Sequence, residues 1–512
     1  MIMKLKVIIK EFLKKYWKFI LAFTGLNFFL FYNTFLKEHV YHQKFLWPTI
    51  LLQLFSEVAI ISLYAVLKNK KWKIGKIFIP IFILLGLSHL VITPFYQTYD
   101  ENAHIARVYS ITDGNFIAKA DENGEYIREF PSSFMEVMTD AFQDQLYYRK
   151  VKKNLLMKDN KDKEGIAFSN TVSYNPIAYV PAIVGVSLGR TLNLPTVLTT
   201  YLGRFCTMIV FAVMCYFALK NMPKYKEFML LIMLLPTTVQ QGMAYSGDAM
   251  LFGAAFLLIA ISLKYIYDKK VKISGSQISL MVILIFLIAN CKSIVYLPIA
   301  FLLLLIPKER FKKPSIKLII VGAMIVAAGV SLLWTLTQTP ASSDVDVATE
   351  GGFGYILTHP FDYGSTLIGT LMNDFYGLIA QLFGQEISPY FIKHTPSIYT
   401  VIFIVLAFSL LYRNIERVMI KRAEKVLYAL IPIMIVALVY TASFTQWGEV
   451  KIEDYTIWGI QGRYFTPLAL LLPLCLQPKK YEKRNPISVD YVFMFGVFAN
   501  SCILACKFLY NF

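Results

Sequence analysis

TPFYQTYDENAHIARVYSITDG, residues 93–114, connects an apolar segment to a cluster of charged side chains. Pro94 helps to stop a helix at the end of the apolar segment. If a new helix follows, Asp100, His104 and Arg107 fall at i, i+4 and i+7, along one face. An acid, a base and a cation are therefore expected together where the chain leaves a membrane.

The composition around this stretch is that of a polytopic membrane protein. Of the 512 residues, 56% are hydrophobic, the mean hydropathy is +0.53, and apolar runs of membrane-spanning length recur. The net charge of +18 comes from short basic blocks between apolar runs, which favours cytoplasmic loops over nucleic-acid binding. The six cysteines lie in or beside apolar segments without metal-type CxxC spacing, so no disulfide framework is expected.

The expected fold is all-α, with about thirteen transmembrane helices. Lys292 interrupts the stretch 277–306, and a lysine held in mid-membrane is costly, so two short spans joined at Lys292 are expected there. The thirteen candidate spans are 17–36, 47–67, 76–94, 199–219, 228–245, 249–267, 277–290, 293–306, 316–338, 397–412, 426–445, 460–477 and 489–507.

Segment 177–189 is apolar but too short to cross a bilayer. If it does not cross, all the basic blocks and the lysine-rich N-terminus fall on one side, which the positive-inside rule identifies as cytoplasmic. We therefore expect 177–189 to be an interfacial or re-entrant helix. Two long polar segments, 95–198 and 339–396, then lie on the extracytoplasmic side.

Local patterns suggest the structure of these two loops. Asn123-Gly124 within 117–130 predicts a small β-hairpin. The charged passage 147–165 is typical of a solvated, mobile loop. Residues 361–384 are apolar with scattered polar residues, which indicates a helix lying along the outer surface.

Each charged residue near Asp100 also has a purely structural interpretation. Thr98-x-x-Glu101 matches a capping box. His104 could be a hydrogen-bonded spacer, and Arg107 could pair with a carboxylate one helical turn away.

The remaining polar residues have structural alternatives of the same kind. Asp248 could be the acid of a helix start, and the sequence Tyr174-Asn175-Pro176 could only begin a helix. Lys292 and Arg463 could extend to lipid headgroups. Together on one face of the membrane, however, ionisable residues favour a functional site, because they are expensive at membrane depth.

Several motifs resemble a bacterial membrane-protein family known as domain of unknown function 2142, which is similar to the GT-C superfamily of lipid-donor glycosyltransferases. The resemblance covers about residues 76–480. In the family the acidic motif usually follows the first span, whereas here it follows the third. The matching pieces are PFYQTYDENAHIARVYSITDGNF (94–116), YNPIAYVPAIVGVSLGRTLNL (174–194), YLGRF (201–205), LLPTTVQQGMAYSGDAM (234–250), KSIVYLP (292–298) and QGRYFTPLALLLPL (461–474).

The resemblance implies four regions: an N-terminal transmembrane hairpin extension (1–70), a GT-C-like catalytic module (71–338) that includes the loop 95–198, an extracytoplasmic loop with an interfacial helix (339–396), and a C-terminal transmembrane bundle (397–512). It also implies a multi-pass protein of the cell membrane with a cytoplasmic N-terminus and an extracytoplasmic active site.

The implied activity is transfer of a sugar from a polyprenyl-phosphate carrier to a cell-surface glycan. Asp100 is expected to be the catalytic base, and Asp100 with Asp248 to hold Mg²⁺ or Mn²⁺ if the enzyme uses a metal. The expected catalytic residues are Asp100, Glu101, His104 and Asp248. The residues expected to bind substrate or phosphate are Arg107, Tyr174, Asn175, Arg204, Lys292, Gln461, Arg463 and Tyr464.

Two other functions remain open at the level of sequence. A transporter or flippase of a lipid-linked sugar would need a polar path through the bilayer, and a non-catalytic partner in polysaccharide assembly would not need the clustered carboxylates. The expected partners are the lipid-linked sugar, a glycan acceptor and membrane lipid, with no nucleic acid.

Overall fold

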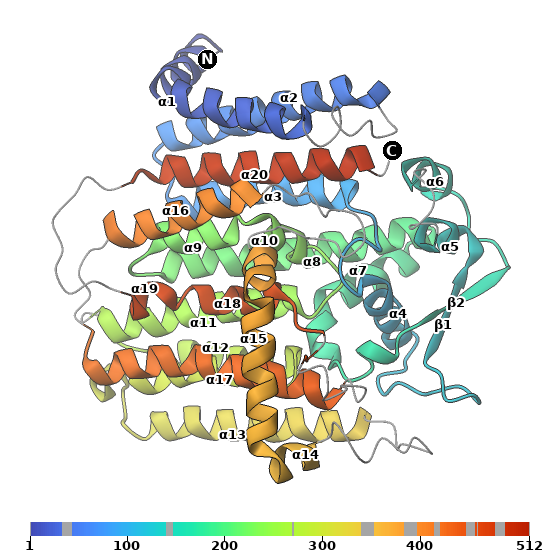
Figure 1. Ribbon diagram of the computed structural model, residues 1–512, viewed down its shortest axis with the longest axis vertical. Helices are drawn as coiled ribbons and strands as arrows, with labels where there is room; N and C mark the ends of the chain where they lie inside the picture. The colour runs from blue at the N-terminus through green and yellow to red at the C-terminus, as the bar shows by residue number, and fades with distance from the viewer. Residues whose placement is uncertain are drawn as a thin grey trace.

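The computed structural model is mostly helical. Its long helices run roughly parallel, and a smaller group of short helices and two strands gathers at one end of this bundle (Figure 1). Residues 339–352, at the start of the second long polar segment, lie outside the described residues. The structure describes residues 2–32, 43–139, 147–268, 271–338, 353–382, 397–413, 420–446, 456–457, 459–476 and 487–510.

Among the described residues, seven helices are long and apolar enough to cross a membrane. The thirteen predicted spans are therefore only partly confirmed. The seven are α2 (Gln43–Asn69), α3 (Ile74–Ile92), α8 (Thr196–Asn221), α11 (Asp248–Tyr267), α13 (Ile316–Gln338), α17 (Arg422–Gln446) and α20 (Val489–Tyr510).

Other predicted spans are shorter or less apolar helices. The first helix, α1 (Ile2–Phe31), is long but carries many lysines in its first half. Two short apolar helices are α12 (Gly275–Cys291) and α16 (Ser397–Arg413), and η4 (Leu297–Leu305) is a 3₁₀ helix. Lys292 lies between α12 and η4, at the break where the sequence predicted a turn.

Prolines divide two predicted spans into pieces, because proline lacks the N–H that continues a helix. The segment 228–245 forms α9 (Lys226–Met233) and α10 (Pro236–Gln241) instead of one helix. The segment 460–477 forms a 3₁₀ turn and two single-turn helices, which are η7 (Gly462–Phe465), α18 (Thr466–Ala469) and α19 (Leu472–Cys475).

The first long polar segment holds more regular structure than expected. A two-stranded antiparallel sheet is present, but it pairs β1 (Ile127–Pro131) with β2 (Lys163–Ala167). Asn123-Gly124 lies in a tight turn ahead of β1 and does not join the strands, because the chain between them forms α5 (Ser132–Thr139) and α6 (Tyr147–Asn154). The expectation of a loop was therefore wrong for 147–154 and 163–165, whereas residues 155–162 between them form neither helix nor strand.

Helix α7 (Val180–Thr191) follows η3 (Pro176–Tyr179) and packs closely on α8. A Cβ at Gly185 would come within 2.6 Å of the Cα of Gly203, so glycine is required for this approach. The same packing places α4 (Glu101–Thr112) against α7. The helix that begins at the acidic stretch is thus fixed to the bundle.

A buried ion pair joins α4 to α8. Arg204 and Glu101 have fully buried side chains, and the Nε of Arg204 donates a hydrogen bond to Glu101 at 2.9 Å. Arg204 also donates to the carbonyl oxygen of Thr93 at 2.7 Å, and Glu101 accepts from the backbone N–H of Tyr245 at 2.9 Å. This pair holds the turn between α3 and α4 against α8 and against the turn between α10 and α11.

The two N-terminal helices, α1 and α2, are held by a residue near the other end of the chain. The buried carboxylate of Asp490 on α20 accepts hydrogen bonds from Tyr16 on α1, from Tyr64 and Lys68 on α2, and from Ser488. Helices α1 and α2 both pack on α20. Segments 1–70 and 397–512 therefore share an interface.

We predict that Arg204→Met destabilises the protein by about 3–5 kcal/mol, because the substitution leaves the carboxylate of Glu101 buried without its cation. The free energy of unfolding is measured by denaturation of the purified protein in detergent micelles. The control is Arg190→Met, which breaks a half-exposed ion pair with Asp113 and should cost about 0–1 kcal/mol. Equal effects of the two substitutions would contradict the assignment.

Candidate functional site

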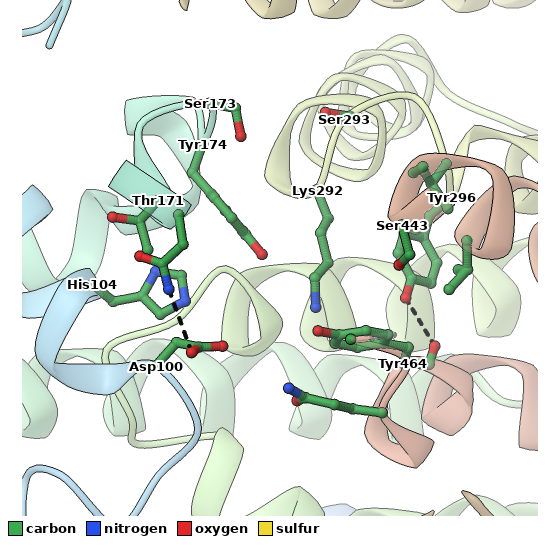
Figure 2. Close-up of a pocket in the computed structure, with 16 residues that line it drawn as sticks. Asp100, His104, Thr171, Ser173, Tyr174, Lys292, Ser293, Tyr296, Ser443 and Tyr464 are labelled. Atoms are coloured by element: carbon green, nitrogen blue, oxygen red, sulfur yellow. Dashed lines mark hydrogen bonds between the residues drawn. The ribbon is translucent and has the colours of Figure 1, made fainter. Parts of the chain in front are cut away.

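A cavity of about 280 Å³ lies where five segments of the chain meet. They are the N-terminal half of α4, the turn around 170–174, the turn at Lys292, the end of α17 and the segment 459–464. Figure 2 shows that the side chains of Asp100, Tyr174 and Lys292 extend toward the space between these segments. Six residues singled out from sequence line this cavity, namely Asp100, His104, Tyr174, Lys292, Gln461 and Tyr464.

Asp100 stands at the cavity wall as an exposed carboxylate. It is the N-cap of α4 and has a left-handed backbone conformation, with φ of 57°. Such conformations are uncommon for residues other than glycine and concentrate at functional sites. Its carboxylate accepts one long hydrogen bond, from Asn170 Nδ2 at 3.4 Å, so it is free to meet a ligand on its other side.

His104 lies one helical turn after Asp100 and is buried. Its Nδ1 is 2.6 Å from the hydroxyl of Tyr179, and its ring meets the ring of Tyr174 edge to face. Burial, and then the positive charge of Arg463, lower the pKa of His104 to about 3. The imidazole is therefore neutral near pH 7 and is a weak base.

Asp248, Lys292 and Arg463 form a charged triad beside the cavity. Lys292 Nζ lies 2.8 Å from one carboxylate oxygen of Asp248, and Arg463 Nε lies 3.1 Å from the other. Lys292 Nζ also lies 3.6 Å above the ring centre of Tyr464, a cation–π contact. Two cations thus share one carboxylate, which leaves a net positive charge in the triad.

This triad retains unused hydrogen-bonding capacity. Within the described part of the chain, Nη1 of Arg463 is buried and has no hydrogen-bond partner. The side-chain oxygen of Gln461, in the cavity wall, also lacks one there. Buried polar groups without partners are costly and often mark the place of a ligand. An anion in the cavity would meet Lys292, which lines it, while Arg463 adds positive charge from beside Asp248.

Four predicted site residues lie elsewhere. Glu101 and Arg204 form the structural ion pair described above, so the capping-box interpretation of Glu101 was wrong. The guanidinium of Arg107 is buried and donates to the carbonyl oxygens of Asn115 and Phe116. Asn175 accepts from the backbone N–H of Ile177 and so caps η3. None of these four side chains lines the cavity.

The structure gives little support for a shared metal site at Asp100 and Asp248. Among the described residues, no group of three or more His, Cys, Asp or Glu side chains could hold a metal ion. Both oxygens of Asp248 face cations. Mg²⁺ or Mn²⁺ at Asp100 would need its other ligands from water and substrate phosphate, as is common for Mg²⁺.

Three residues of the site were missed in the sequence. Asn170 contacts Asp100, Tyr179 contacts His104, and the hydroxyl of Tyr296 donates to the carbonyl oxygen of Tyr464 at 2.9 Å. Tyr179 and Tyr296 occur within motifs that were singled out. The sequence separation between each tyrosine and its partner, however, does not predict their contact.

Comparison with known proteins places the chain in one family. A family model described as "Predicted membrane protein (DUF2142)" matches residues 27–472. No curated protein and no solved structure matches the chain. The predicted family is confirmed, while its similarity to GT-C glycosyltransferases stays a prediction.

The pKa of Lys292 makes anion binding at the cavity dependent on pH. Burial lowers this pKa to about 8, although Asp248 opposes the shift. Lys292 is therefore charged below about pH 8 and neutral above it. We predict that the affinity for farnesyl phosphate, measured by titration calorimetry, falls as the pH rises from 7 to 9.

The control for this experiment is Lys292→Arg, because arginine keeps its charge over the whole range. This variant should bind with an affinity that changes little between pH 7 and 9. If the wild type shows no loss of affinity, or if both proteins lose affinity equally, Lys292 is not the group that titrates.

Proposed function

Because this chain belongs to the DUF2142 family of predicted membrane proteins, we propose that it is a membrane glycosyltransferase of GT-C type. It transfers a sugar from a polyprenyl-phosphate carrier to a cell-surface glycan at the extracytoplasmic face. One observation carries the proposal: a single cavity brings the exposed carboxylate of Asp100 together with Lys292, and Lys292 shares the carboxylate of Asp248 with a second cation, Arg463.

The cationic side of the cavity suits the phosphate of the carrier. Lys292 and Arg463 together carry two positive charges and Asp248 carries one negative charge, so one positive charge is available for a phosphodiester. A guanidinium and an ammonium group in a buried site stabilise the charge that develops on a departing phosphate. Lys292 lines the cavity and lies over the ring of Tyr464, and Arg463 adds positive charge through its contact with the other oxygen of Asp248.

The acidic side of the cavity suits the acceptor hydroxyl. Asp100 takes the proton of the hydroxyl, whose oxygen forms a bond to C1 of the sugar. The bond between C1 and the phosphate oxygen breaks, and its electron pair leaves with the polyprenyl phosphate. Asp100 serves better than His104 as this base, because its carboxylate is exposed at the cavity, whereas His104 is buried and its Nδ1 contacts Tyr179.

The apolar part of the wall suits the carrier lipid. Val439 and Ala442 on α17 and Val295 near the Lys292 turn line the cavity opposite the acidic residues. An isoprenoid chain attached to a phosphate at Lys292 would find apolar neighbours there. If the enzyme uses Mg²⁺ or Mn²⁺, the ion at Asp100 would supply further positive charge to the phosphate.

We predict that Asp100→Asn lowers the rate of sugar transfer by roughly 10²- to 10⁴-fold, because the amide cannot accept the proton of the acceptor. Transfer from polyprenyl-phosphate-linked sugars is measured in membranes with matched protein levels. The control is Asp113→Asn at the other end of α4, where the carboxylate pairs with Arg128 and Arg190.

The control variant should retain transfer close to the wild-type rate. Wild-type transfer by Asp100→Asn would sink the proposal. In that case movement of the lipid-linked sugar across vesicle membranes, measured on the same protein, tests the flippase alternative.

A further inference from the structure

Helix α15 (Pro360–Leu382) has a direction unlike that of the bundle. It runs across the long helices rather than along them (Figure 1). The helix supplies no residue to the cavity wall, yet it packs against η7, which carries Arg463 and Tyr464. This contact links α15 to the site.

Two hydrogen bonds from α15 hold the segment that leads to Arg463. The backbone N–H of Ile457 donates to Thr370 Oγ1 at 2.9 Å. The backbone N–H of Gly462 donates to Gln381 Oε1 at 2.8 Å. Thr370 and Gln381 are separated by about three helical turns, so they lie on the same face of α15. We call these two residues the inner clamp.

Gly462 allows the closest approach between the two elements. A Cβ at this position would lie 2.0 Å from the carbonyl oxygen of Leu378 and 2.8 Å from the Cβ of Gln381. The backbone of α15 therefore fixes the residue that immediately precedes Arg463. Gln461, on the other side of Gly462, belongs to the cavity wall.

The opposite face of α15 is exposed and mostly apolar, with Ser365 as a polar residue among the apolar ones. These exposed residues recur at the spacing of a single helical stripe, and none carries a charge. The outer stripe consists of Phe361, Ile368, Met372, Phe375 and Tyr376.

The contacts of α15 with α17 indicate what covers this stripe. The hydroxyl of Tyr363 lies 2.8 Å from Thr441 Oγ1, and its ring packs edge to face on Phe444. Thr441 and Phe444 belong to the last turns of a membrane-spanning helix. An exposed apolar stripe on a helix that packs against a membrane-spanning helix lies against the acyl chains of lipids.

We propose that α15 is a lipid-anchored strap. Its outer stripe binds the acyl chains of the surrounding leaflet. Its inner clamp, together with the close contact at Gly462, positions Arg463 and Tyr464 at the cavity. Thr370 and Gln381 are thus positioning residues that do not touch the ligand. The effect of the strap on donor binding rests on the proposed function.

The lipid contact is tested with a photoreactive benzoylphenylalanine at Phe375 in the full-length protein. The protein is placed in vesicles of phosphatidylethanolamine and phosphatidylglycerol, irradiated, and examined by mass spectrometry. Phe375 is 58% exposed, whereas Phe444 is 1% exposed and serves as the matched aromatic control. We expect phospholipid adducts at position 375 and only cross-links within the protein at position 444. Cross-links from position 375 to another protein chain would overturn the lipid assignment.

The clamp is tested by two substitutions of one residue. Gln381→Met keeps the length of the side chain but removes the acceptor, whereas Gln381→Glu keeps an oxygen that can accept from Gly462. We expect amide hydrogen exchange in peptides covering 457–464 to be about fivefold faster in the methionine variant. The glutamate variant should exchange like the wild type. Equal exchange in all three proteins would overturn the clamp.

Binding of farnesyl phosphate connects the strap to the cavity. We expect Gln381→Met to weaken this binding about fivefold, and Gln381→Glu to restore it. If the wild type binds and the methionine variant binds equally well, the coupling of the strap to the cavity is wrong. If the wild type does not bind at all, the proposed function fails, whereas the cross-linking and exchange results still decide the strap.

Discussion

A charged side chain inside an apolar bundle must find a partner, because an isolated ion there costs several kcal/mol. This constraint determines where α4 begins and how it lies. Glu101 pairs with Arg204, and the same arginine donates a hydrogen bond to the carbonyl oxygen of Thr93. The position of the break between α3 and α4 is therefore fixed relative to α8. Asp100 is the residue directly before Glu101. The position of the exposed carboxylate therefore depends on the buried one.

The same constraint shapes the cationic side of the cavity, with a different outcome. Asp248 has two cationic neighbours, Lys292 and Arg463, so the pairing of charges is incomplete. A site with one positive charge in excess, next to a cavity, is prepared for an anion. The contrast with the closed pair of Glu101 and Arg204 separates a structural ion pair from a candidate binding site.

The elements that bring these charges together are interrupted helices. The chain breaks at Lys292, where α12 ends, and again at η7 and α18, where Pro467 prevents a long helix. Irregular backbone within a membrane bundle is tolerated where it lines a cavity or is buried in protein. Continuous helices at these two places would have carried Lys292 and Arg463 along separate faces. The breaks turn both side chains toward Asp248.

Helix α15 extends this argument from the cavity to the lipid. The contact at Gly462 leaves no space between the strap and the segment that carries Arg463. Packed elements of this kind transmit small displacements because the interior is dense. A displacement of the outer stripe is therefore transmitted to the cavity by a short route. Its last step is the hydrogen bond between Gln381 and the backbone next to Arg463.

The sequence by itself determined the class of protein, the family, the break at Lys292 and six of the residues that line the cavity. Composition and hydropathy are local properties, and an acidic or basic residue beside an apolar run is visible without a structure. The sequence also suggested a role at the site for Glu101 and Arg204, whose motifs look as polar as the others.

Only the tertiary structure decided which charged side chains are neutralised by a partner. Glu101 and Arg204 are about one hundred residues apart, and no spacing reveals that they neutralise each other. Likewise, the meeting of Asp248 with Lys292 and Arg463 depends on how broken helices pack. The number of partners that a buried charge has is a property of three-dimensional packing, and this number separates the structural residues from the candidate site.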